Sequence, residues 1–339
     1  MTGFSKTGFG VSLVGSGSAT PAQKVTNDQL SLLVDTNDEW VVSRTGIRER
    51  RIIGSDESIS DLCYRAAQSA LTMANWEPQS IDLILMATST PDDLFGMAPK
   101  VQAKLGANNA VAFDLTAACS GFLFALVTAA QFLQNGSYKR VLIIGSDQLS
   151  GWMDWKDRRS CILFGDGAGA IAIEATSKDK ESFIGFELKS DGRRGDCLNL
   201  SEKKNFVPLV DSYQTQQAGF NNIQMNGQEV YKFAVREVPS LLQKVFDLCG
   251  ISPESLDWLL LHQANQRILN AVANRFSIPH EKVLSNLASY GNTSAATIPI
   301  MLDEAVRDGR VQPGHLIASS GFGAGLSWGV ALFRWNGPS

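Results

Sequence analysis

The chain has 339 residues, 44% of them hydrophobic and 19% charged, and a formal net charge of −4. This composition is typical of a globular enzyme with a sizeable core, and the length predicts two domains or one large double unit. The negative net charge gives no electrostatic support for nucleic-acid binding, so we expect no nucleic-acid partner.

The cysteines and the N-terminal stretch indicate the compartment. The five cysteines, an odd number with no CxxC spacing, argue against a disulfide framework or a zinc site and indicate a reducing compartment. The N-terminal sequence MTGFSKTGFGVSLVGSG has no charged region followed by an apolar block, so we expect no signal peptide. We therefore expect a cytoplasmic protein with no metal and no membrane partner.

The first half of the chain has the pattern of alternating strands and helices. We expect a short buried strand over 10–17, helices over 26–34 and 58–74, strands over 81–87, 111–115 and 141–145, and a glycine-rich strand pair around 164–173. Between the two helices lies TNDEWVVSRTGIRERR, in which four arginines follow Trp40 in close succession.

The second half begins with residues 178–222, which are more polar and irregular. After them we expect a helix over 230–248, a strand over 256–261 with His262 directly behind it, helices over 265–276 and 293–306, and strands over 315–319 and 328–333. Both halves therefore follow one order: strand, helix, strand, buried helix, strand and glycine-rich strand.

Three sequence blocks repeat in the same order in the two halves. SIDLILMATST (80–90) matches SLDWLLLHQAN (255–265), LQNGSYKRVLIIGSD (133–147) matches VRDGRVQPGHLIASSG (306–321), and FGDGAGAIAI (164–173) echoes FGAGLSWGVA (322–331). The repeat predicts a duplicated α/β protein, with an N-terminal half over 1–176 and a C-terminal half over 177–339. Each half should form a mainly parallel sheet flanked by helices.

The stretch 114–133, DLTAACSGFLFALVTAAQFL, carries the first candidate residue. Its run from Gly121 is apolar on every side, so it should be a helix buried in a core. Cys119 should lie at the first turn, where unpaired N–H groups and the helix dipole favour a thiolate, and its small neighbours would admit a substrate. Cys119 is therefore a candidate nucleophile, with a small buried hydrophobe as the alternative.

His262 and Asn292 are the other polar candidates. Active sites of open α/β sheets lie beyond the carboxyl ends of strands, and pseudo-twofold packing of the halves would bring both residues to Cys119. A neutral His262, near the start of a helix that Asn265 caps, and the amide of Asn292 could both donate to one carbonyl oxygen. The alternatives are that His262 is a hydrogen-bonded histidine at the end of a strand and that Asn292 is the N-cap of a helix. The segment GFGAG (321–325) could bring a backbone N–H to the sulfur, or be a tight turn.

Seven motifs in order carry a family resemblance. They are TNDEWVVSRTGIRER, FDLTAACSGF, ILFGDGAGA, HQANQRI, YGNTSAAT, LDEAVRDGRVQPG and GFGAGLSWG. Together they resemble β-ketoacyl-acyl-carrier-protein synthase III, a condensing enzyme that initiates type II fatty acid synthesis, over nearly the whole chain. The resemblance implies a thiolase-like fold, with two duplicated α/β halves in a five-layered αβαβα arrangement.

The resemblance also implies roles for individual residues. Cys119 would accept the acyl group, and His262 and Asn292 would act in decarboxylation. The backbone N–H groups of Cys119 and Ala324 would form the acyl oxyanion hole. The other implied contacts are to coenzyme A (Thr36, Trp40, Arg44, Arg158, Tyr231, Ala264 and Asn265, with Trp40 and Arg158 on the two faces of adenine), in the acyl pocket (Phe95 and Phe322), and to the carrier protein (Lys232, Arg267 and Arg275).

Several positions depart from the family pattern. Arg159 stands where a glycine often occurs, beside the expected adenine clamp. Ala324 stands where some members have glycine, and Asn274 replaces a lysine of the basic patch. Residues 200–222 make a longer segment than usual, near the expected mouth of the tunnel. We therefore expect the coenzyme A site and the carrier-protein docking face to differ in detail from the family pattern.

The implied reaction has two steps and needs no permanently bound cofactor. The thiolate of Cys119 attacks acetyl-CoA or another short acyl-CoA, and CoA leaves. His262 and Asn292 then hold the thioester oxygen of the malonyl carrier protein while CO₂ departs, and the enolate attacks the acyl-cysteine. The partners expected from the resemblance are an acyl-CoA, the acyl carrier protein and a second copy of the chain in a homodimer.

Other functions remain open at this point. A chalcone-synthase-like or quinolone-forming condensing enzyme would take malonyl-CoA in place of a carrier protein, and a cysteine-dependent acyl-CoA thioesterase would release free acid. A non-catalytic carrier-binding protein would keep three polar groups in dry surroundings at a cost in stability. An exchange of substrates distinguishes these alternatives.

Overall fold

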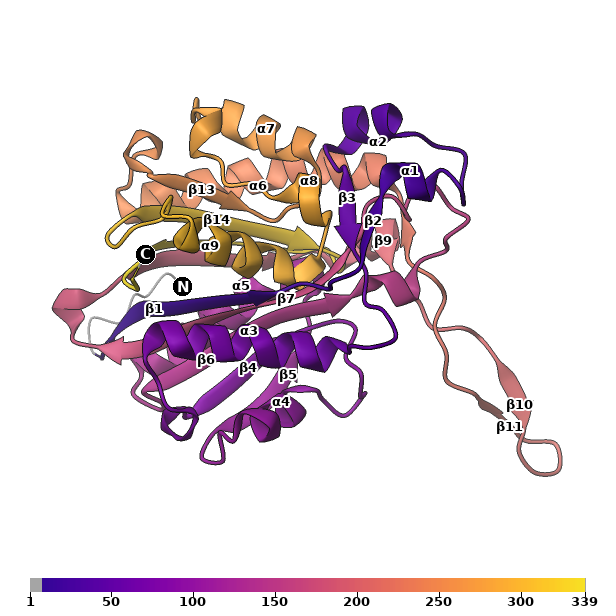
Figure 1. Cartoon of the computed structure of the whole chain (residues 1–339), viewed down its shortest axis with the longest axis horizontal. Coiled ribbons are helices and arrows are strands. Elements are labelled where there is room, and N and C mark those ends of the chain that lie inside the picture. Colours follow the sequence, from indigo (N-terminus) through magenta and orange to yellow (C-terminus); the bar gives the residue numbers. More distant parts are fainter. Residues whose placement is uncertain (1–7, 339) are drawn as a thin grey trace.

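The computed structural model describes residues 8–338. Residues 1–7 and residue 339 lie outside the described residues. They include the start of the stretch examined for a signal peptide and the outer ends of the two expected halves. Within residues 8–338, no helix has both the length and the apolar character needed to cross a membrane. Figure 1 shows two sheets stacked with helices between and outside them.

The first sheet has five strands in the order β1-β7-β6-β4-β5 (Figure 1). The strands are β1 (Gly10–Ala19), β4 (Leu83–Ala87), β5 (Val111–Leu115), β6 (Arg140–Gln148) and β7 (Asp166–Thr176). Strand β4 runs parallel to β5 and β6, whereas β7 runs antiparallel to β1 and β6.

The second sheet has four strands in the order β13-β14-β15-β8. They are β8 (Phe183–Ser190), β13 (Trp258–Leu261), β14 (Leu316–Gly323) and β15 (Ser327–Arg334). Strand β13 runs parallel to β14, and β15 runs antiparallel to β14 and β8. A single parallel bridge from Val283 to Leu259 stands where the first sheet has β5.

The two sheets repeat one topology, because β8, β15, β14 and β13 correspond to β1, β7, β6 and β4. This confirms the duplicated fold, but the expectation of mainly parallel sheets is wrong. In the second sheet the physical reason is the short connection between two strands. Strand β14 ends at Gly323 and β15 begins at Ser327, whereas a parallel crossover needs a dozen residues or more. The division of the chain at residue 176 remains a prediction.

The helices complete five layers (Figure 1). The buried helices α5 (Gly121–Gln134) and α9 (Thr297–Arg307) lie between the sheets and contact strands of both. Helices α3 (Ile59–Ala74) and α4 (Ala98–Leu105) cover the outer face of the first sheet, and α6 (Gly227–Cys249) and α7 (Gln266–Arg275) cover the second. The arrangement is the expected αβαβα.

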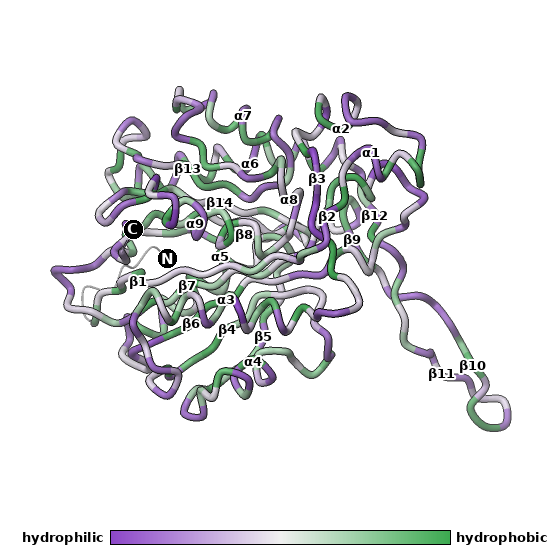
Figure 2. The backbone as a smooth tube through the Cα atoms, viewed as in Figure 1, coloured by the Kyte–Doolittle hydropathy of each residue, from purple (hydrophilic) through white to green (hydrophobic). Residues whose placement is uncertain are grey.

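Helix α5 is apolar on all sides because both sheets enclose it. Phe122, Leu123 and Leu126 are almost fully buried in one core with Val141 of β6 and Ala331 of β15. Figure 2 shows white and green along the central elements and purple on much of the periphery. The central layer therefore joins the two halves through one shared apolar core.

Some local elements differ from the expected ranges. The helix expected over 26–34 is a single turn, α1 (Asn27–Leu30), which Thr26 caps. The arginine-rich stretch contains a helix, α2 (Asp38–Thr45), that Asn37 begins and Gly46 ends at a φ of 83°. The remaining elements are β2 (Lys24–Thr26), β3 (Glu49–Arg51), β9 (Leu198–Asn199), β10 (Phe206–Pro208), β11 (Gln214–Gln216), β12 (Gln224–Met225) and α8 (Leu287–Tyr290).

Residues 200–222 form an arm that stands away from the body (Figure 1). It contains the β10–β11 hairpin, and its base joins the body at the β9–β12 ladder. Phe206, Leu209 and Tyr213 are more than half exposed, and β10 is green in Figure 2. Residues 178–222 were expected to be polar and irregular. The base of the arm fits this expectation, but β10 does not, because it carries apolar side chains that the body does not cover.

Candidate active site

Cys119 lies where the first half passes from a strand into the central helix. Strand β5 ends at Leu115, a short 3₁₀ turn covers Ala118–Ser120, and α5 begins at Gly121. Cys119 is 8% exposed. Its place at the start of a buried helix is the one expected from the sequence.

The surroundings of Cys119 favour the thiol. Burial raises the pKa of Cys119 to about 12, the hydroxyl of Ser294 opposes this rise, and the carboxyl group of Asp147 adds to it. Burial therefore acts against the thiolate that the helix N-terminus is expected to favour, while the backbone N–H of Cys119 lowers the pKa. The effect of the helix N-terminus stays a prediction. Forming the thiolate requires hydrogen bonds from neighbouring groups or the arrival of substrate.

His262 follows β13 directly and is 1% exposed. Its Nδ1 lies 2.7 Å from the hydroxyl of Thr297 in α9, and the ring of Phe322 meets the imidazole edge to face, with 5.3 Å between centroids. Burial lowers the pKa of His262 to about 3. The imidazole is therefore neutral at physiological pH, as expected, although burial is the cause and not the helix N-terminus.

Asn292 is oriented by a tight turn. Its Oδ1 accepts a hydrogen bond from the N–H of Ser294 at 2.8 Å, and its backbone pairs with Leu163 and Gly165. Because Oδ1 is engaged, Nδ2 is the end of the amide left to donate into the cavity. The alternative of a helix N-cap is wrong, since Ala296 occupies that position of α9.

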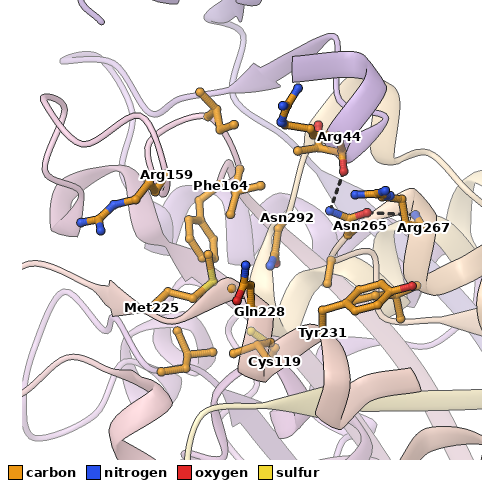
Figure 3. A pocket seen from close by; sticks show the side chains of 18 of the residues that line it. Arg44, Cys119, Arg159, Phe164, Met225, Gln228, Tyr231, Asn265, Arg267 and Asn292 are labelled. Carbon is orange, nitrogen blue, oxygen red and sulfur yellow. Dashed lines mark hydrogen bonds between the residues drawn. The ribbon is translucent and has the colours of Figure 1, made fainter. Parts of the chain in front are cut away.

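One cavity of about 750 Å³ joins these three residues. Figure 3 labels Cys119 and Asn292 among the residues that line it. Cys119, His262 and Asn292 all line it, although they come from three distant parts of the chain. The other expected residues on its wall are Trp40, Arg44, Tyr231, Ala264, Asn265, Arg267 and Phe322. Asn265 caps α7, as expected, and its amide donates to the carbonyl oxygen of Arg44 at 3.0 Å (Figure 3).

The end of β14 reaches the nucleophile at Gly323. A Cβ atom there would lie 2.6 Å from the backbone nitrogen of Cys119, so the close approach requires glycine. Gly323 lines the cavity, whereas Ala324 borders a neighbouring hollow with Gly325. The role of Ala324 in the oxyanion hole stays a prediction, and Gly323 is a residue that the sequence reasoning missed.

The expected adenine clamp is closed in this structure. The guanidinium carbons of Arg44 and Arg158 lie 4.4 and 5.1 Å from the ring centre of Trp40. A flat base between two stacked groups needs about 7 Å, twice a carbon–carbon contact of about 3.5 Å. Arg158 instead pairs with Asp35 at 3.0 Å, and neither Arg158 nor Thr36 lines the cavity. The role of Arg158 beside adenine stays a prediction, and it would require Arg158 to move away from Trp40.

Three other expected residues lie away from the cavity wall. Phe95 is fully exposed on the loop after β4. Lys232 pairs with Glu229 at 3.0 Å, and Arg275 is exposed at the end of α7. Their roles in the acyl pocket and in carrier-protein docking remain predictions.

Arg159 lines the cavity, although the sequence assigned no contact to it. Its Nε lies 2.9 Å from Oδ1 of Asp157. The signal available in the sequence was that Arg159 stands where the family often has glycine. Leu198 and Met225, in the ladder at the base of the arm, also line the cavity, and only the expected nearness of residues 200–222 to the tunnel mouth pointed to them.

Comparisons with known proteins identify the family of the chain. The family model described as 3-oxoacyl-[acyl-carrier-protein (ACP)] synthase III matches residues 113–192, and the model of its C-terminal part matches residues 246–335. A β-ketoacyl-[acyl-carrier-protein] synthase III of Prochlorococcus marinus strain SARG is 78% identical over 338 residues, which cover 100% of both chains. A protein of the same name from Synechococcus sp. strain WH7803 is 64% identical, again over 100% of both.

Solved structures show the same relation. The crystal structure of 3-oxoacyl-[acyl-carrier-protein] synthase III from Aquifex aeolicus VF5 is 42% identical, with a TM-score of 0.88, and covers 96% of this chain and 100% of its own. The enzyme from Pseudomonas aeruginosa PAO1 is 37% identical, with a TM-score of 0.87 over 97% of this chain and 99% of its own. The chain therefore belongs to the β-ketoacyl-acyl-carrier-protein synthase III family of condensing enzymes.

Proposed function

We propose that this chain condenses an acyl-CoA, acetyl-CoA or another short one, with malonyl-acyl-carrier protein. The products are a 3-oxoacyl carrier protein (acetoacetyl from acetyl-CoA), CoA and CO₂, and the reaction begins fatty acid synthesis. The observation that carries the proposal is that a sulfur, a neutral imidazole and a carboxamide, from Cys119, His262 and Asn292, line one cavity. Arg44, Arg159 and Arg267 on its wall suit the phosphates of thioester carriers.

In the first step, the sulfur of Cys119 attacks the thioester carbonyl and forms the acyl-cysteine. The thioester bond to CoA breaks, and the proton that Cys119 gives up ends on the sulfur of CoA. The carbonyl oxygen becomes negative in the transition state, and a backbone N–H such as that of Cys119 can stabilise it. Gly323 keeps the space beside that N–H open.

In the second step, the malonyl thioester oxygen accepts hydrogen bonds from His262 and Asn292. The C–C bond to the carboxylate breaks, CO₂ leaves, and the enolate carbon attacks the acyl-cysteine, which releases the sulfur of Cys119. Donation by His262 requires a proton on Nε2. The hydroxyl of Thr297 lies 2.7 Å from Nδ1 and 3.1 Å from the carbonyl oxygen of Ser294. This tautomer forms when that hydroxyl gives its one proton to Nδ1 in place of the carbonyl oxygen. The step needs no permanently bound cofactor, since CO₂ loss drives it.

We also infer a homodimer in the cytoplasm. Strand β5 is an edge strand, and its Val111 and Phe113 are 49% and 39% exposed. Leu94 and Phe95, on the loop after β4, are 84% and 101% exposed. An unprotected apolar edge strand is a template for pairing with another chain. Pairing through the first halves would cover these side chains and allow Phe95 to reach the partner's acyl pocket.

The test uses purified protein and two substrates in sequence. Incubation with acetyl-CoA should add one acetyl group to Cys119, seen by intact and peptide mass spectrometry. Malonyl-acyl-carrier protein should then discharge the adduct and yield acetoacetyl-acyl-carrier protein. Discharge by malonyl-CoA at an equal rate would favour a carrier-independent condensing enzyme, and release of free acetate without a malonyl substrate would favour a thioesterase.

A further inference from the structure

Ser294 is in contact with the candidate catalytic residues on three sides. Its hydroxyl donates to Sγ of Cys119 at 3.4 Å, and its N–H donates to Oδ1 of Asn292 at 2.8 Å. Its carbonyl oxygen accepts from the hydroxyl of Thr297 at 3.1 Å, and that hydroxyl lies 2.7 Å from Nδ1 of His262. Ser294 is 2% exposed, so bulk water does not compete for these contacts.

The turn that contains Ser294 does not need a hydroxyl. Ser294 has a φ of 53°, and Ala118 has a φ of 48° at the start of the corresponding turn in the first half. The two turns, Ala118–Ser120 and Ser294–Ala296, both lead into a buried helix. Because alanine builds this turn in the first half, the hydroxyl in the second half is explained by what it contacts. It donates to the sulfur of Cys119 at 3.4 Å, and the carboxyl group of Asp147 is its other neighbour.

The ionisable groups that face the sulfur do not stabilise its charge. They are the carboxyl group of Asp147, at the end of β6, and the imidazole of His262, which shares the cavity. Asp147 raises the pKa of the thiol, and His262, whose burial lowers its pKa to about 3, carries no positive charge. Among the described residues, the hydroxyl of Ser294 is the side-chain donor seen on the sulfur.

We propose that Ser294 is a positioning residue for the nucleophile: its hydroxyl donates a hydrogen bond to the sulfur of Cys119 and stabilises the thiolate relative to the thiol. Ser294 keeps its own proton throughout. The inference rests on the proposed role of Cys119 and adds a residue that controls how reactive this sulfur is. The backbone contacts of Ser294 to Asn292 and Thr297 do not depend on the side chain, so a substitution tests the hydroxyl alone.

The test is alkylation of Cys119 by iodoacetamide between pH 7 and pH 9, followed by peptide mass spectrometry, which separates Cys119 from the other four cysteines. A hydrogen bond to a charged group changes an equilibrium by about tenfold or more, which is about one pKa unit. Ser294→Ala should therefore slow alkylation about tenfold at each pH. Ser294→Gly should do the same, and it should fold, because a φ of 53° suits glycine.

The matched control is Ser120→Ala. Ser120 is fully buried beside Cys119, but its hydroxyl donates to the carbonyl oxygen of Ala117 at 2.7 Å. This variant should alkylate at the wild-type rate. Unchanged rates in both Ser294 variants, or an equal slowing in Ser120→Ala, would overturn the proposal. The assay uses no thioester, so its result is independent of whether the chain condenses acyl-CoA with the malonyl carrier protein.

Discussion

The two turns that lead into the central helices have one backbone and two kinds of chemistry. The turn before α5 carries Cys119, and the turn before α9 carries Ala295 at the corresponding position. Each turn is crossed by a strand of the other half, with Gly323 of β14 against Cys119 and Gly145 of β6 against Ala295. A side chain at either glycine would collide with the opposite turn, so both halves make the same close approach.

The difference lies in what occupies the backbone N–H at each turn. The N–H of Ala295 donates to Oδ2 of the buried Asp147 at 3.2 Å, so a carboxylate fills the place where an oxyanion could bind. Beside Cys119 stands Gly323 of β14, which has no side chain, and both residues line the cavity. Duplication thus supplied the scaffold twice, and single side chains decide which copy holds the nucleophile.

Exchanging Cys119 and Ala295 between the two turns is the strongest test of this difference. Cys119→Ala should abolish the acyl-enzyme, because it removes the attacking sulfur. The double variant Cys119→Ala/Ala295→Cys should also stay unacylated, because Asp147 occupies the N–H of residue 295. Intact mass after incubation with acetyl-CoA measures both. An acetyl adduct on the introduced cysteine would show that the two turns are chemically equivalent.

Removal of the imidazole tests the donors of the second half. In the repeat, His262 corresponds to Ala87 at the end of β4, so His262→Ala makes the second half resemble the first. Loss of one preorganised donor should slow decarboxylation of the malonyl carrier protein about 10²–10³-fold. Acyl-enzyme formation should persist. Release of labelled CO₂ gives the rate, and loss of acylation to the same extent would contradict the separate roles.

The open space beside Cys119 can be closed by one methyl group. Gly323→Ala would place a Cβ atom 2.6 Å from the nitrogen of Cys119, so the chain must shift and the oxyanion loses its donor. We expect acylation to slow about 10²-fold in a single-turnover assay. The control is Gly192→Ala, where nothing lies within 4 Å of the added atom. Equal rates in the two variants would show that the close approach has no catalytic role.

Helix α7 distinguishes the cavity wall from the outer surface of the second half. Arg267 lines the cavity, whereas Arg275 is exposed at the far end of the helix. Arg267→Ala should raise KM for the malonyl carrier protein several-fold, and Arg275→Ala should raise it less, with both effects shrinking at high salt. Steady-state kinetics at two ionic strengths measure this, and a larger effect at Arg275 would move the docking face outward.

The smallest expected effect concerns pH, which should not change the rate of malonyl decarboxylation in the second step. Burial holds the pKa of His262 near 3, well below its ordinary value of 6.5, so the imidazole stays neutral as pH falls from 8 to 5. The rate of malonyl decarboxylation by Cys119→Ala should therefore be flat over this range. A fall in rate with a midpoint near pH 6.5 would show that His262 is protonated in the folded protein.

The sequence was sufficient for the fold and for the grouping of Cys119, His262 and Asn292 in one cavity. Repeated blocks predict repeated topology, and the ends of corresponding strands meet at one place. Strand direction was not available in the same way, because a buried strand has the same composition whether its neighbour is parallel or antiparallel. The antiparallel strands β7 and β15 were missed for this reason.

The properties that escaped the sequence depend on contacts between the halves. The pKa of Cys119 follows from burial by the opposite half, which local spacing does not reveal. Ser294 appeared only as part of a small-residue motif, and its contact with the sulfur requires both turns in place. The positions of Arg158 and Arg159 depend on ion pairs with Asp35 and Asp157, which a motif comparison does not include.

The crossing of each turn by a strand of the opposite half makes the catalytic pocket a product of assembly. The two glycines of β14 shape the surroundings of the nucleophile, and Gly145 of β6 shapes the turn behind the amide donor. Neither half, made alone, would contain a complete pocket, because each lacks the strand that closes its turn. If the chain were cut between the halves, its activity would therefore be proportional to the fraction of molecules in which the two fragments have reassembled.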